Sequence, residues 1–223
     1  MEQRKKVAII VAGGSGTRMG SAVPKQFLQL AGKPVLWHTV NAFVQAYIDM
    51  EIVLVLPEAH FSYVADWIGD FKQVMLVKGG ETRFNSVLNG LNTVQEPAVI
   101  FVHDGVRPMV STALIHRCYE GAIAQGSAIP VIDMKDSIRE LVPGGNRAVD
   151  REQFKIIQTP QTFLSEWILP AFEQPFDPLF TDEASVVERQ GRQVQLVPGD
   201  EANIKITRPL DLTIAEALLG ARD

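Results

Sequence analysis

Glycines and cations follow the first apolar run of the chain in a pattern suited to binding phosphate groups. Residues 7–11 are apolar, the residues Ala12, Gly13 and Gly14 come next, and Arg18 and Lys25 follow. Glycines after a strand let backbone N–H groups close on phosphate oxygens. We expect the two cations to bind a triphosphate from which pyrophosphate leaves. The alternative is a plain turn between a strand and a helix, with solvated cations.

Two common phosphate-binding loops do not fit this segment. A dinucleotide-binding fingerprint requires a glycine where Met19 stands and an acidic residue about 20 residues further on, and neither is present. A P-loop requires Gly-Lys followed by Ser or Thr, which is also absent. The sequence therefore disfavours a dinucleotide-dependent oxidoreductase.

A carboxylate and an arginine follow a second apolar run, at residues 98–102. Asp104 and Gly105 come directly after His103, and Arg107 follows shortly. The carboxyl ends of parallel strands line the ligand crevice of an α/β sheet, and a carboxylate there suits Mg²⁺ or another divalent cation that also binds phosphate. We expect Arg107 to hold a second phosphate through paired hydrogen bonds, and His103 to be structural. The alternative makes Asp104 the N-cap of the next turn.

Two further segments place polar groups after predicted strands. Gly79 and Gly80 form a junction at which a base could approach the backbone, and Ser86 lies in the helix that follows. Lys205 stands just before the last helix, within the run from Asn203 to Thr207. The alternatives are an ordinary Gly-Gly turn before a helix, and a solvated lysine on an edge strand.

These segments need a scaffold that brings them together. Apolar runs typical of buried parallel strands alternate with segments whose apolar residues recur at helical spacing. The alternation predicts an α/β fold with a doubly wound, mostly parallel sheet, as a single domain over residues 1–223. Expected strands lie at 7–11, 52–56, 74–77, 98–102, 128–132 and 193–197, with a strand or loop at 156–163; expected helices lie at 34–47, 58–71, 81–94, 111–124, 165–172, 181–190 and from 209.

Residues 134–150 break the alternation. They contain charges, the run Pro143-Gly144-Gly145, and apolar residues only at intervals. This pattern favours two short strands around a turn. Because such a hairpin buries little by itself, we expect a protruding β-arm that packs on a second subunit and makes a homodimer. The alternative is a solvent-exposed flap.

Composition and charge exclude several classes of protein. With 46% apolar and 21% charged residues, the chain can bury a sizeable core. The net charge of -5 argues against nucleic-acid and anionic-membrane partners, which select basic surfaces. The single cysteine, Cys118, excludes an intramolecular disulfide and a cysteine-based zinc site. The charged start does not fit a targeting signal, and no apolar run has the length of a membrane span, so we expect a cytoplasmic location.

Short motifs in one order along the chain resemble those of a known enzyme family. The motifs lie at residues 11–19, 24–26, 79–87, 103–108, 159–161, 181–185 and 203–207. The first two resemble the signature of sugar-phosphate nucleotidyltransferases. The whole set resembles the 2-C-methyl-D-erythritol 4-phosphate cytidylyltransferases of non-mevalonate isoprenoid synthesis. This resemblance implies transfer of CMP from CTP to a small polyol phosphate, giving 4-diphosphocytidyl-2-C-methyl-D-erythritol and pyrophosphate.

The resemblance also implies a role for each motif residue. The backbone of Ala12, Gly13 and Gly14 would hold the CTP phosphates together with Arg18. Stabilisation of the charge on the α-phosphate would fall to Arg18, Lys25 and Lys205. The residues implied for cytosine and ribose are Gly80, Ser86, Asp104 and Gly105. The residues implied for the polyol phosphate are Arg107 and Thr159, with Ser137 and Arg151 from the arm of a second subunit.

The sequence departs from the family pattern at two places. The family carries an acidic residue directly before Asn-Ile-Lys, where this chain has Ala202. Asp200 and Glu201, just upstream, are therefore the candidates for a second carboxylate on the metal's side. The arm is also slightly longer near Met134, which shifts the alignment of Ser137.

Two rival functions share parts of this pattern. Ribitol-5-phosphate cytidylyltransferases share the first loop, Pro-Lys-Gln and Asn-Ile-Lys, but they depart from the Asp-Glu-Ala-Ser run that this chain carries at residues 182–185. The other rival is a non-catalytic nucleotide-binding regulator on the same fold. The presence of Arg18, Lys25 and Lys205 together disfavours it.

Overall fold

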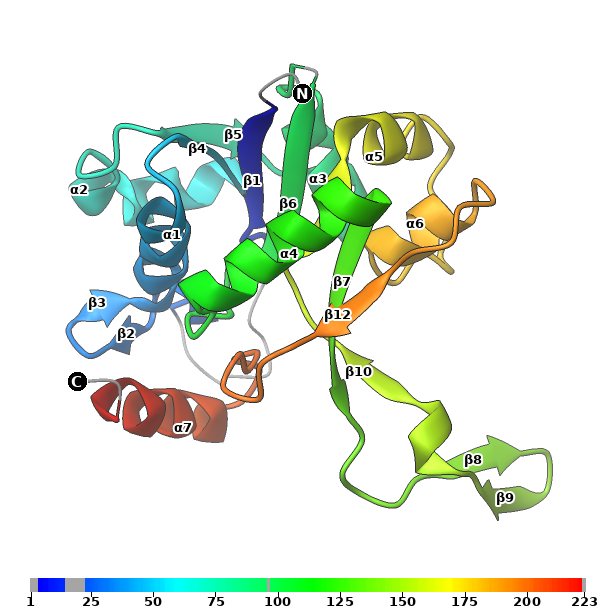
Figure 1. Cartoon of the computed structure of the whole chain (residues 1–223). Coiled ribbons are helices and arrows are strands. Elements are labelled where there is room, and N and C mark those ends of the chain that lie inside the picture. Colours follow the sequence, from blue (N-terminus) through cyan, green and yellow to red (C-terminus); the bar gives the residue numbers. More distant parts are fainter. Residues whose placement is uncertain (1–3, 15–22, 96, 222–223) are drawn as a thin grey trace.

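A computed structural model describes residues 4–14, 23–95 and 97–221 of the chain. In this part, one large sheet has the strand order β10-β7-β11-β6-β1-β4-β5, with β12 paired to β7 beside this path (Figure 1). The strands are β1 (Lys5–Val11), β4 (Met50–Leu56), β5 (Val74–Lys78), β6 (Ala98–Asp104), β7 (Ser127–Asp133), β10 (Lys155–Ile157), β11 (Gln161–Leu164) and β12 (Leu196–Pro198). The strands β5, β4, β1 and β6 are parallel, so the predicted doubly wound, mostly parallel fold is confirmed.

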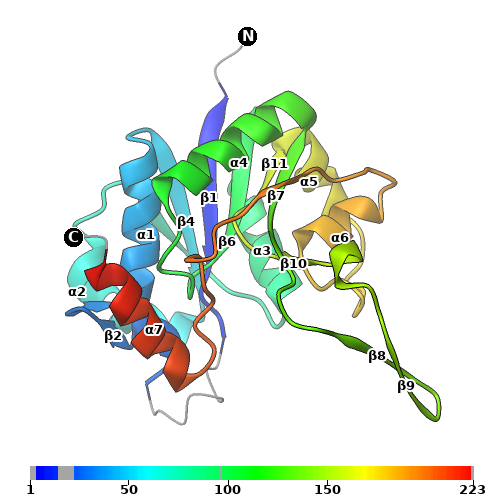
Figure 2. The same cartoon turned by 60° about the horizontal axis from the view of Figure 1, so that its bottom comes forward.

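Helices cover both faces of this sheet. The helices α1 (Val35–Ala46) and α4 (Thr112–Gln125) lie on one face, and α3 (Arg83–Leu91), α5 (Ser165–Ala171) and α6 (Glu183–Glu188) lie on the other (Figure 2). Successive residues of a strand point to opposite faces. In β1, Ala8 and Ile10 therefore pack under α1 and α4, whereas Val7 and Ile9 pack against the helices of the other face.

The last helix, α7 (Pro209–Gly220), closes a smaller apolar cluster beside the main sheet. It packs near a short hairpin formed by β2 (Gln29–Leu30) and β3 (Lys33–Pro34). The buried members of the cluster include Leu30, Met109, Ile206 and Ala215. This cluster joins the segment after the first loop to the segment before the last helix.

The arm is a two-stranded hairpin that extends away from the rest of the chain. It consists of β8 (Arg139–Val142) and β9 (Gly145–Ala148), which pair only with each other in the described part of the structure (Figures 1 and 2). Gly144 takes a φ of 81° in the turn, a conformation that favours glycine. Leu141 is 84% exposed, so the hairpin buries little of its own apolar surface. Among the described residues, no helix has the length and apolarity needed to cross a membrane.

The helix expected at 81–94 ends at Leu91, and the segment expected at 156–163 is divided into β10 and β11. Three further elements differ from the expectation. The helix expected at 58–71 is a 3-10 helix at Glu58–Tyr63 followed by the short α2 (Ala65–Ile68), and Gly69 ends it. The strand expected to end at residue 102 continues to Asp104, because parallel pairing with β1 uses backbone groups and tolerates polar side chains. The strand expected at 193–197 begins only at Leu196, where it pairs with β7.

Candidate active site

A cleft of about 290 Å³ opens where β1, β5 and β6 end at one edge of the sheet. Backbone hydrogen bonds fix these ends: Gly105 N–H donates to the Val11 carbonyl at 2.9 Å, and Gly79 N–H donates to the Leu56 carbonyl at 3.0 Å. The cleft is lined by residues that the sequence singled out: Ala12, Gly13, Gly14, Lys25, Gly80, Ser86, Asp104 and Lys205. The fold therefore brings three separate strand-end motifs and the late lysine into one cleft.

The helical turn at Lys25–Phe27 holds the first loop through side-chain hydrogen bonds. Gln26 Nε2 donates to the carbonyls of Ala12, at 2.8 Å, and Gly14, at 3.1 Å. Lys25 is 8% exposed, and its Nζ donates to the Ile206 carbonyl at 2.8 Å. Arg18, which the sequence predicts to bind the same phosphates, lies outside the described residues. The carbonyls of Ala12 and Gly14 are thus occupied by Gln26.

Gly80 and Ser86 form the opposite wall of the cleft. Thr82 caps α3 by accepting from Asn85 N–H. The Ser86 hydroxyl donates to the Thr82 carbonyl at 2.9 Å and accepts from Gly80 N–H at 3.1 Å. A Cβ added at Gly80 would lie 2.4 Å from the Asn85 Cβ, so only glycine fits this turn. Ser86 and Gly80 therefore form one rigid unit.

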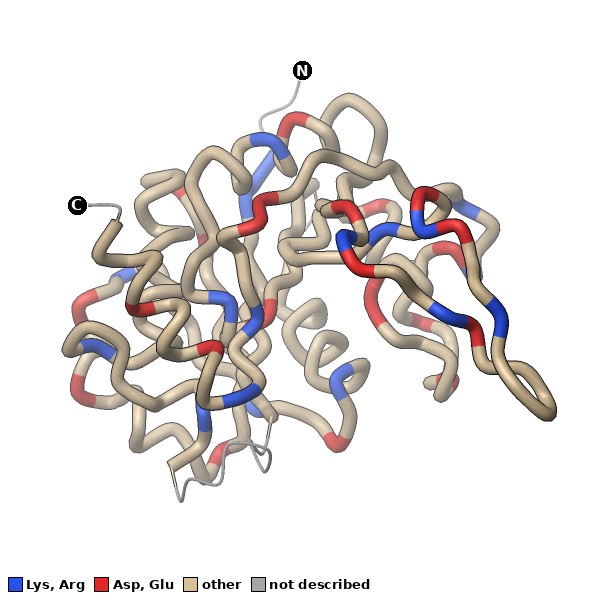
Figure 3. Tube along the Cα trace, turned by 90° about the horizontal axis from the view of Figure 1, so that it is seen from below, with Lys and Arg blue, Asp and Glu red and all other residues tan. Residues whose placement is uncertain are grey.

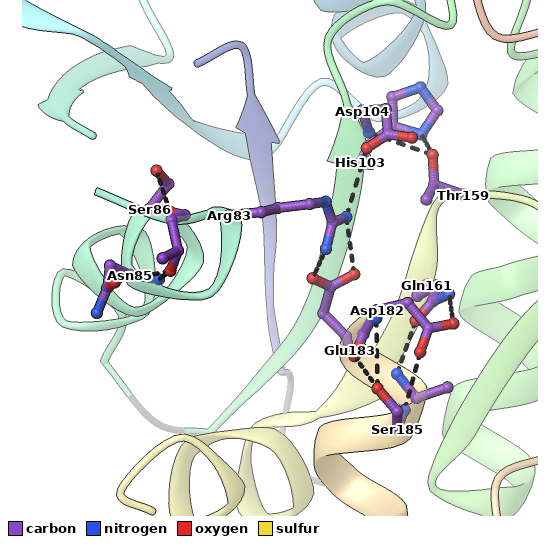
Figure 4. Close-up of polar contacts among 12 residues, drawn as sticks. Arg83, Asn85, Ser86, His103, Asp104, Thr159, Gln161, Asp182, Glu183 and Ser185 are labelled. Atoms are coloured by element: carbon purple, nitrogen blue, oxygen red, sulfur yellow. Dashed lines mark hydrogen bonds and ion pairs between the residues drawn. The ribbon is translucent and has the colours of Figure 1, made fainter. Parts of the chain in front are cut away.

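Asp104 lies at the centre of the cations of this edge. Its Oδ2 is 2.9 Å from Lys205 Nζ and 3.5 Å from Arg107 Nε. Its Oδ1 is 3.4 Å from an amino group of Arg83, a contact that Figure 4 shows. The carboxylate is 7% exposed. Burial alone would raise the pKa of Asp104, but Arg83, Lys205 and Arg107 together hold it well below its usual range. Asp104 is therefore ionised at neutral pH.

Arg83 links Asp104 to a second buried carboxylate. It donates to both carboxylate oxygens of Glu183, at 3.0 Å for Oε2, and Glu183 is 1% exposed (Figure 4). Burial raises the pKa of Glu183, and the charge and hydrogen bonds of Arg83 oppose that rise. Lys25, Arg83 and Lys205 line the cleft together with the carboxylates of Asp104 and Glu81, and Arg107 and Glu183 lie behind it, so the cations of this group outnumber its carboxylates by one.

Arg107 and Thr159 lie behind Asp104, and neither is part of the lining of the cleft. Arg107 donates to the Asn203 carbonyl at 2.8 Å, and Asn203 donates to the Thr159 carbonyl at 2.8 Å. The Thr159 hydroxyl accepts from Asp104 N–H at 3.2 Å and contacts His103 Nδ1 at 3.0 Å. Burial lowers the pKa of His103 to about 3, so this histidine is neutral. Through these contacts, the side chains of Arg107, Asn203, Thr159 and His103 stabilise the end of β6, which carries Asp104.

The arm residues Ser137 and Arg151 are separate from the cleft of their own chain. Arg151 donates to the Lys135 carbonyl within the arm. The strand β11 is antiparallel to both β6 and β7, so β6 and β7 run in the same direction and the arm leaves the sheet at the edge that carries the cleft. Along the arm, Lys and Arg alternate with Asp and Glu (Figure 3).

Neither of the two carboxylates expected on the metal's side reaches the cleft lining. Asp200 accepts from Ala202 N–H at 2.9 Å, and Glu201 pairs with Lys135 at 2.6 Å. The second carboxylate in the cleft lining is Glu81, and Glu183 lies behind it, paired with Arg83. Among the described residues, no group of three or more His, Cys, Asp or Glu side chains could hold a metal ion.

Comparison with known proteins gives the family of this chain. The family model described as 2-C-methyl-D-erythritol 4-phosphate cytidylyltransferase matches residues 6–221. This chain belongs to that family. It is 47% identical to the cytidylyltransferase of that name from Bacteroides thetaiotaomicron, across 96% of this chain and 100% of the relative, and 48% identical to that of Porphyromonas gingivalis strain W83, across 98% and 99%.

A solved structure of a family member has the same fold. The 4-diphosphocytidyl-2C-methyl-D-erythritol synthase of Anaerococcus prevotii superposes with a TM-score of 0.84 at 27% identity, covering 97% of this chain and 96% of that one. The chain is therefore an enzyme of the nucleotidyltransferase class.

Sequence reasoning gave no role to Arg83, Glu183 or Gln26 of this cytidylyltransferase fold. All three lie inside the family motifs, Gln26 and Arg83 in motifs that also contain residues with implied roles, and Glu183 in the motif at 181–185, to which no role was assigned. The signal that could have found Glu183 is an acidic residue in a short apolar helix, which requires a partner if it is buried. The identity of that partner, Arg83, required the fold.

Proposed function

We propose that this chain transfers CMP from CTP to 2-C-methyl-D-erythritol 4-phosphate in the cleft around Asp104, releasing pyrophosphate and supplying an isoprenoid precursor. The observation that carries the assignment of the cleft is the presence of Lys25, Arg83 and Lys205 in its lining, with Arg107 behind Asp104. Together with the first glycine loop, they form a cationic cleft in a chain whose net charge is -5. Such a local excess of positive charge attracts and holds polyphosphates.

The reaction joins two anions, so charge stabilisation is the main task of the protein. The phosphate oxygen of the polyol phosphate attacks the α-phosphorus of CTP, and the bond to pyrophosphate breaks. A phosphate monoester is already largely ionised at neutral pH, so little proton transfer is needed. Catalysis then rests on positioning and on cations fixed before the reaction. Lys25 and Lys205 are proposed to stabilise the α-phosphate, with Arg18 from the first loop.

Asp104 is the residue that we propose to hold a divalent cation such as Mg²⁺. Magnesium binds in proteins through one or two carboxylates together with substrate phosphates, and Asp104 is an ionised carboxylate at the cleft wall. When bound, the ion would neutralise charge on the CTP phosphates. Asp104 would hold it, and Arg83 would keep the carboxylate in position from the other side.

Recognition of the nucleotide and of the polyol is divided between two parts of the structure. Ala12, Gly13 and Gly14 are proposed to hold the CTP phosphates, and Gly80, Ser86 and the Asp104-Gly105 backbone to bind cytidine. The remaining proposed contacts to the polyol phosphate are those of Arg107 and Thr159, with Ser137 and Arg151 from a second subunit.

A homodimer is part of this proposal. The arm leaves the cleft edge of the sheet and exposes Leu141, which supports residues 134–150 as a dimerisation arm on a single domain of residues 1–223. The cytoplasmic location stays a prediction from the sequence.

The test is identification of the product. Purified chain with CTP, 2-C-methyl-D-erythritol 4-phosphate and MgCl₂ should yield a compound with the mass of the diphosphocytidyl product, and one pyrophosphate for each. Asp104→Asn should abolish it, whereas Asp70→Asn, on the exposed surface, should not. Full product formation by Asp104→Asn would show that the cleft is not the active site.

A further inference from the structure

Glu183 is a buried carboxylate at the start of α6, a segment that several hydrogen bonds hold in place. It is the first residue of α6, directly after Asp182, whose carboxylate accepts from Ser185 N–H at 3.0 Å and from Gln161 Nε2 at 2.8 Å. Gln161 also accepts from Ala184 N–H at 2.8 Å. The start of α6 is therefore attached to β11, the strand next to β6 (Figure 4). Because β6 carries Asp104 at its end, Glu183 and Asp104 are fixed to neighbouring strands.

Arg83 lies between these two carboxylates. Its side chain is 34% exposed and forms part of the cleft wall, whereas Glu183 lies behind it with 1% exposed. One amino group is 3.0 Å from Glu183 Oε2 and 3.4 Å from Asp104 Oδ1, and the other donates to Glu183 alone. The guanidinium thus pairs mainly with Glu183 and makes a longer contact with Asp104.

The paired contact of Arg83 with Glu183 limits how Arg83 can contact Asp104. An arginine free to turn would form a paired, two-hydrogen-bond contact with the nearest accessible carboxylate. Glu183 already occupies that paired geometry, so Arg83 is held where it contacts only one oxygen of Asp104. Arg83 thereby orients the Asp104 carboxylate from its Oδ1 side, while Lys205 and Arg107 contact Oδ2.

We propose that Glu183 is a positioning residue of the nucleotidyl-transfer site, acting through Arg83 to fix the orientation of Asp104 for the CTP phosphates and their cation. Glu183 itself touches no ligand. This inference rests on the proposed active site, since it requires that CTP binds in the cleft beside Asp104.

The first test is the steady-state kinetics of Glu183→Gln, which keeps the shape of the side chain and removes its charge. We expect KM for CTP to rise about 10- to 100-fold, the scale of one hydrogen bond to a charged group, with KM for the polyol phosphate unchanged. Partial unfolding would lower the apparent kcat and leave both KM values unchanged, so the KM ratio reports positioning. Glu188→Gln, exposed on the same helix, is the matched control.

The second test is a double-mutant cycle with Arg83→Met. If Glu183 acts only through Arg83, the double variant should lose no more kcat/KM for CTP than Arg83→Met alone. Losses that multiply would overturn the proposal, because they would mean that the two residues act independently. Should Glu183→Gln not fold, Arg83→Lys carries the test: its ammonium keeps the charge but lacks the planar fork, and an unchanged KM for CTP would overturn the proposal.

Two reference variants separate failure of this inference from failure of the proposed active site. If Lys25→Ala and Asp104→Asn lose activity while Glu183→Gln equals the native chain, only the role of Glu183 is wrong. If Lys25→Ala and Asp104→Asn also keep full activity, CTP does not react in this cleft, and both proposals are wrong.

Discussion

Lys25 donates a hydrogen bond of 2.8 Å to the backbone carbonyl of Ile206, although the two residues are 181 positions apart. Ile206 is also part of the apolar cluster under α7, and its N–H donates to the Val106 carbonyl at 2.9 Å. The ammonium group of Lys25 is thus held beside the first loop by the same segment that carries Lys205. The hydrogen bond between Lys25 and Ile206 therefore links Lys25 to the segment that carries Lys205, the other cation proposed for the α-phosphate.

Lys25→Ala should lower kcat about 10²- to 10³-fold, by analogy with the loss of one preorganised donor to a developing charge. Turnover would be followed by pyrophosphate release, with circular dichroism to confirm the fold. Lys72→Ala, which removes an exposed lysine, is the control. Native turnover in Lys25→Ala would mean that Lys25 serves only to hold the Ile206 segment.

Gly80→Ala should raise KM for CTP about tenfold or more, because the new Cβ would lie 2.4 Å from the Asn85 Cβ and would displace the Ser86 hydrogen bond, whose loss is worth about one hydrogen bond. Gly69→Ala is the matched control, since a Cβ there meets nothing within 4 Å. Equal KM values in the two variants would show that the Gly80 turn does not contribute to nucleotide binding.

Asp211→Asn should weaken the start of α7 at neutral pH by about 1 kcal/mol, the usual value of a helix cap. The Asp211 carboxylate accepts from Thr207 N–H at 2.7 Å and Arg208 N–H at 2.8 Å. Burial would raise the pKa of Asp211, but these hydrogen bonds lower it below the ordinary value of 3.8. The stabilisation is therefore complete above that value and is lost as pH falls through the lower folded-state pKa.

Urea unfolding at pH 7 and at pH 3 measures this effect. The difference in free energy of unfolding between the native chain and Asp211→Asn should be smaller at pH 3. Asp70→Asn, at an exposed site, should show little difference at either pH. A gap that widens on acidification would contradict the assigned hydrogen bonds.

Arg151→Ala should raise KM for the polyol phosphate and leave KM for CTP nearly unchanged, if the arm completes the site of a second subunit. Mixing Arg151→Ala chains with Lys25→Ala chains should then restore activity, because a mixed dimer has one site without either defect. Mass spectrometry of differently tagged chains must first show subunit exchange. Exchange without recovered activity would mean that the arm does not share a site across subunits.

Much of the scaffold could be predicted because its signals are local. The continuous apolar runs of β1, β4 and β6 are typical of strands buried on both faces. The insertion of β11 between β6 and β7 could not be predicted, since its four residues carry no turn signal that sets their partner. Residues 58–71 contain apolar residues at helical spacing, but Gly69 and local aromatic packing of Tyr63 on Phe27 favour a shorter structure.

The residues of the candidate site also form two groups: those that the sequence alone identifies and those that only the fold reveals. The glycine junctions and Asp104 can be recognised in the sequence because they come directly after apolar runs, and the ends of such strands line the ligand crevice. The partners of Asp104 are not, because Arg83 and Glu183 are 100 positions apart and only the fold makes them neighbours. For Arg107 the sequence suggested a phosphate ligand, which stays a proposal; the structure adds a hydrogen bond from Arg107 to the Asn203 carbonyl, which the sequence could not predict.

The most direct test of the proposed reaction is a comparison of two acceptors in a pyrophosphate-release assay with CTP. The chain should release pyrophosphate with a far higher kcat/KM for 2-C-methyl-D-erythritol 4-phosphate than for ribitol 5-phosphate, and the release should require a divalent cation. A higher kcat/KM for ribitol 5-phosphate, or no release with either acceptor from folded protein, would contradict the account.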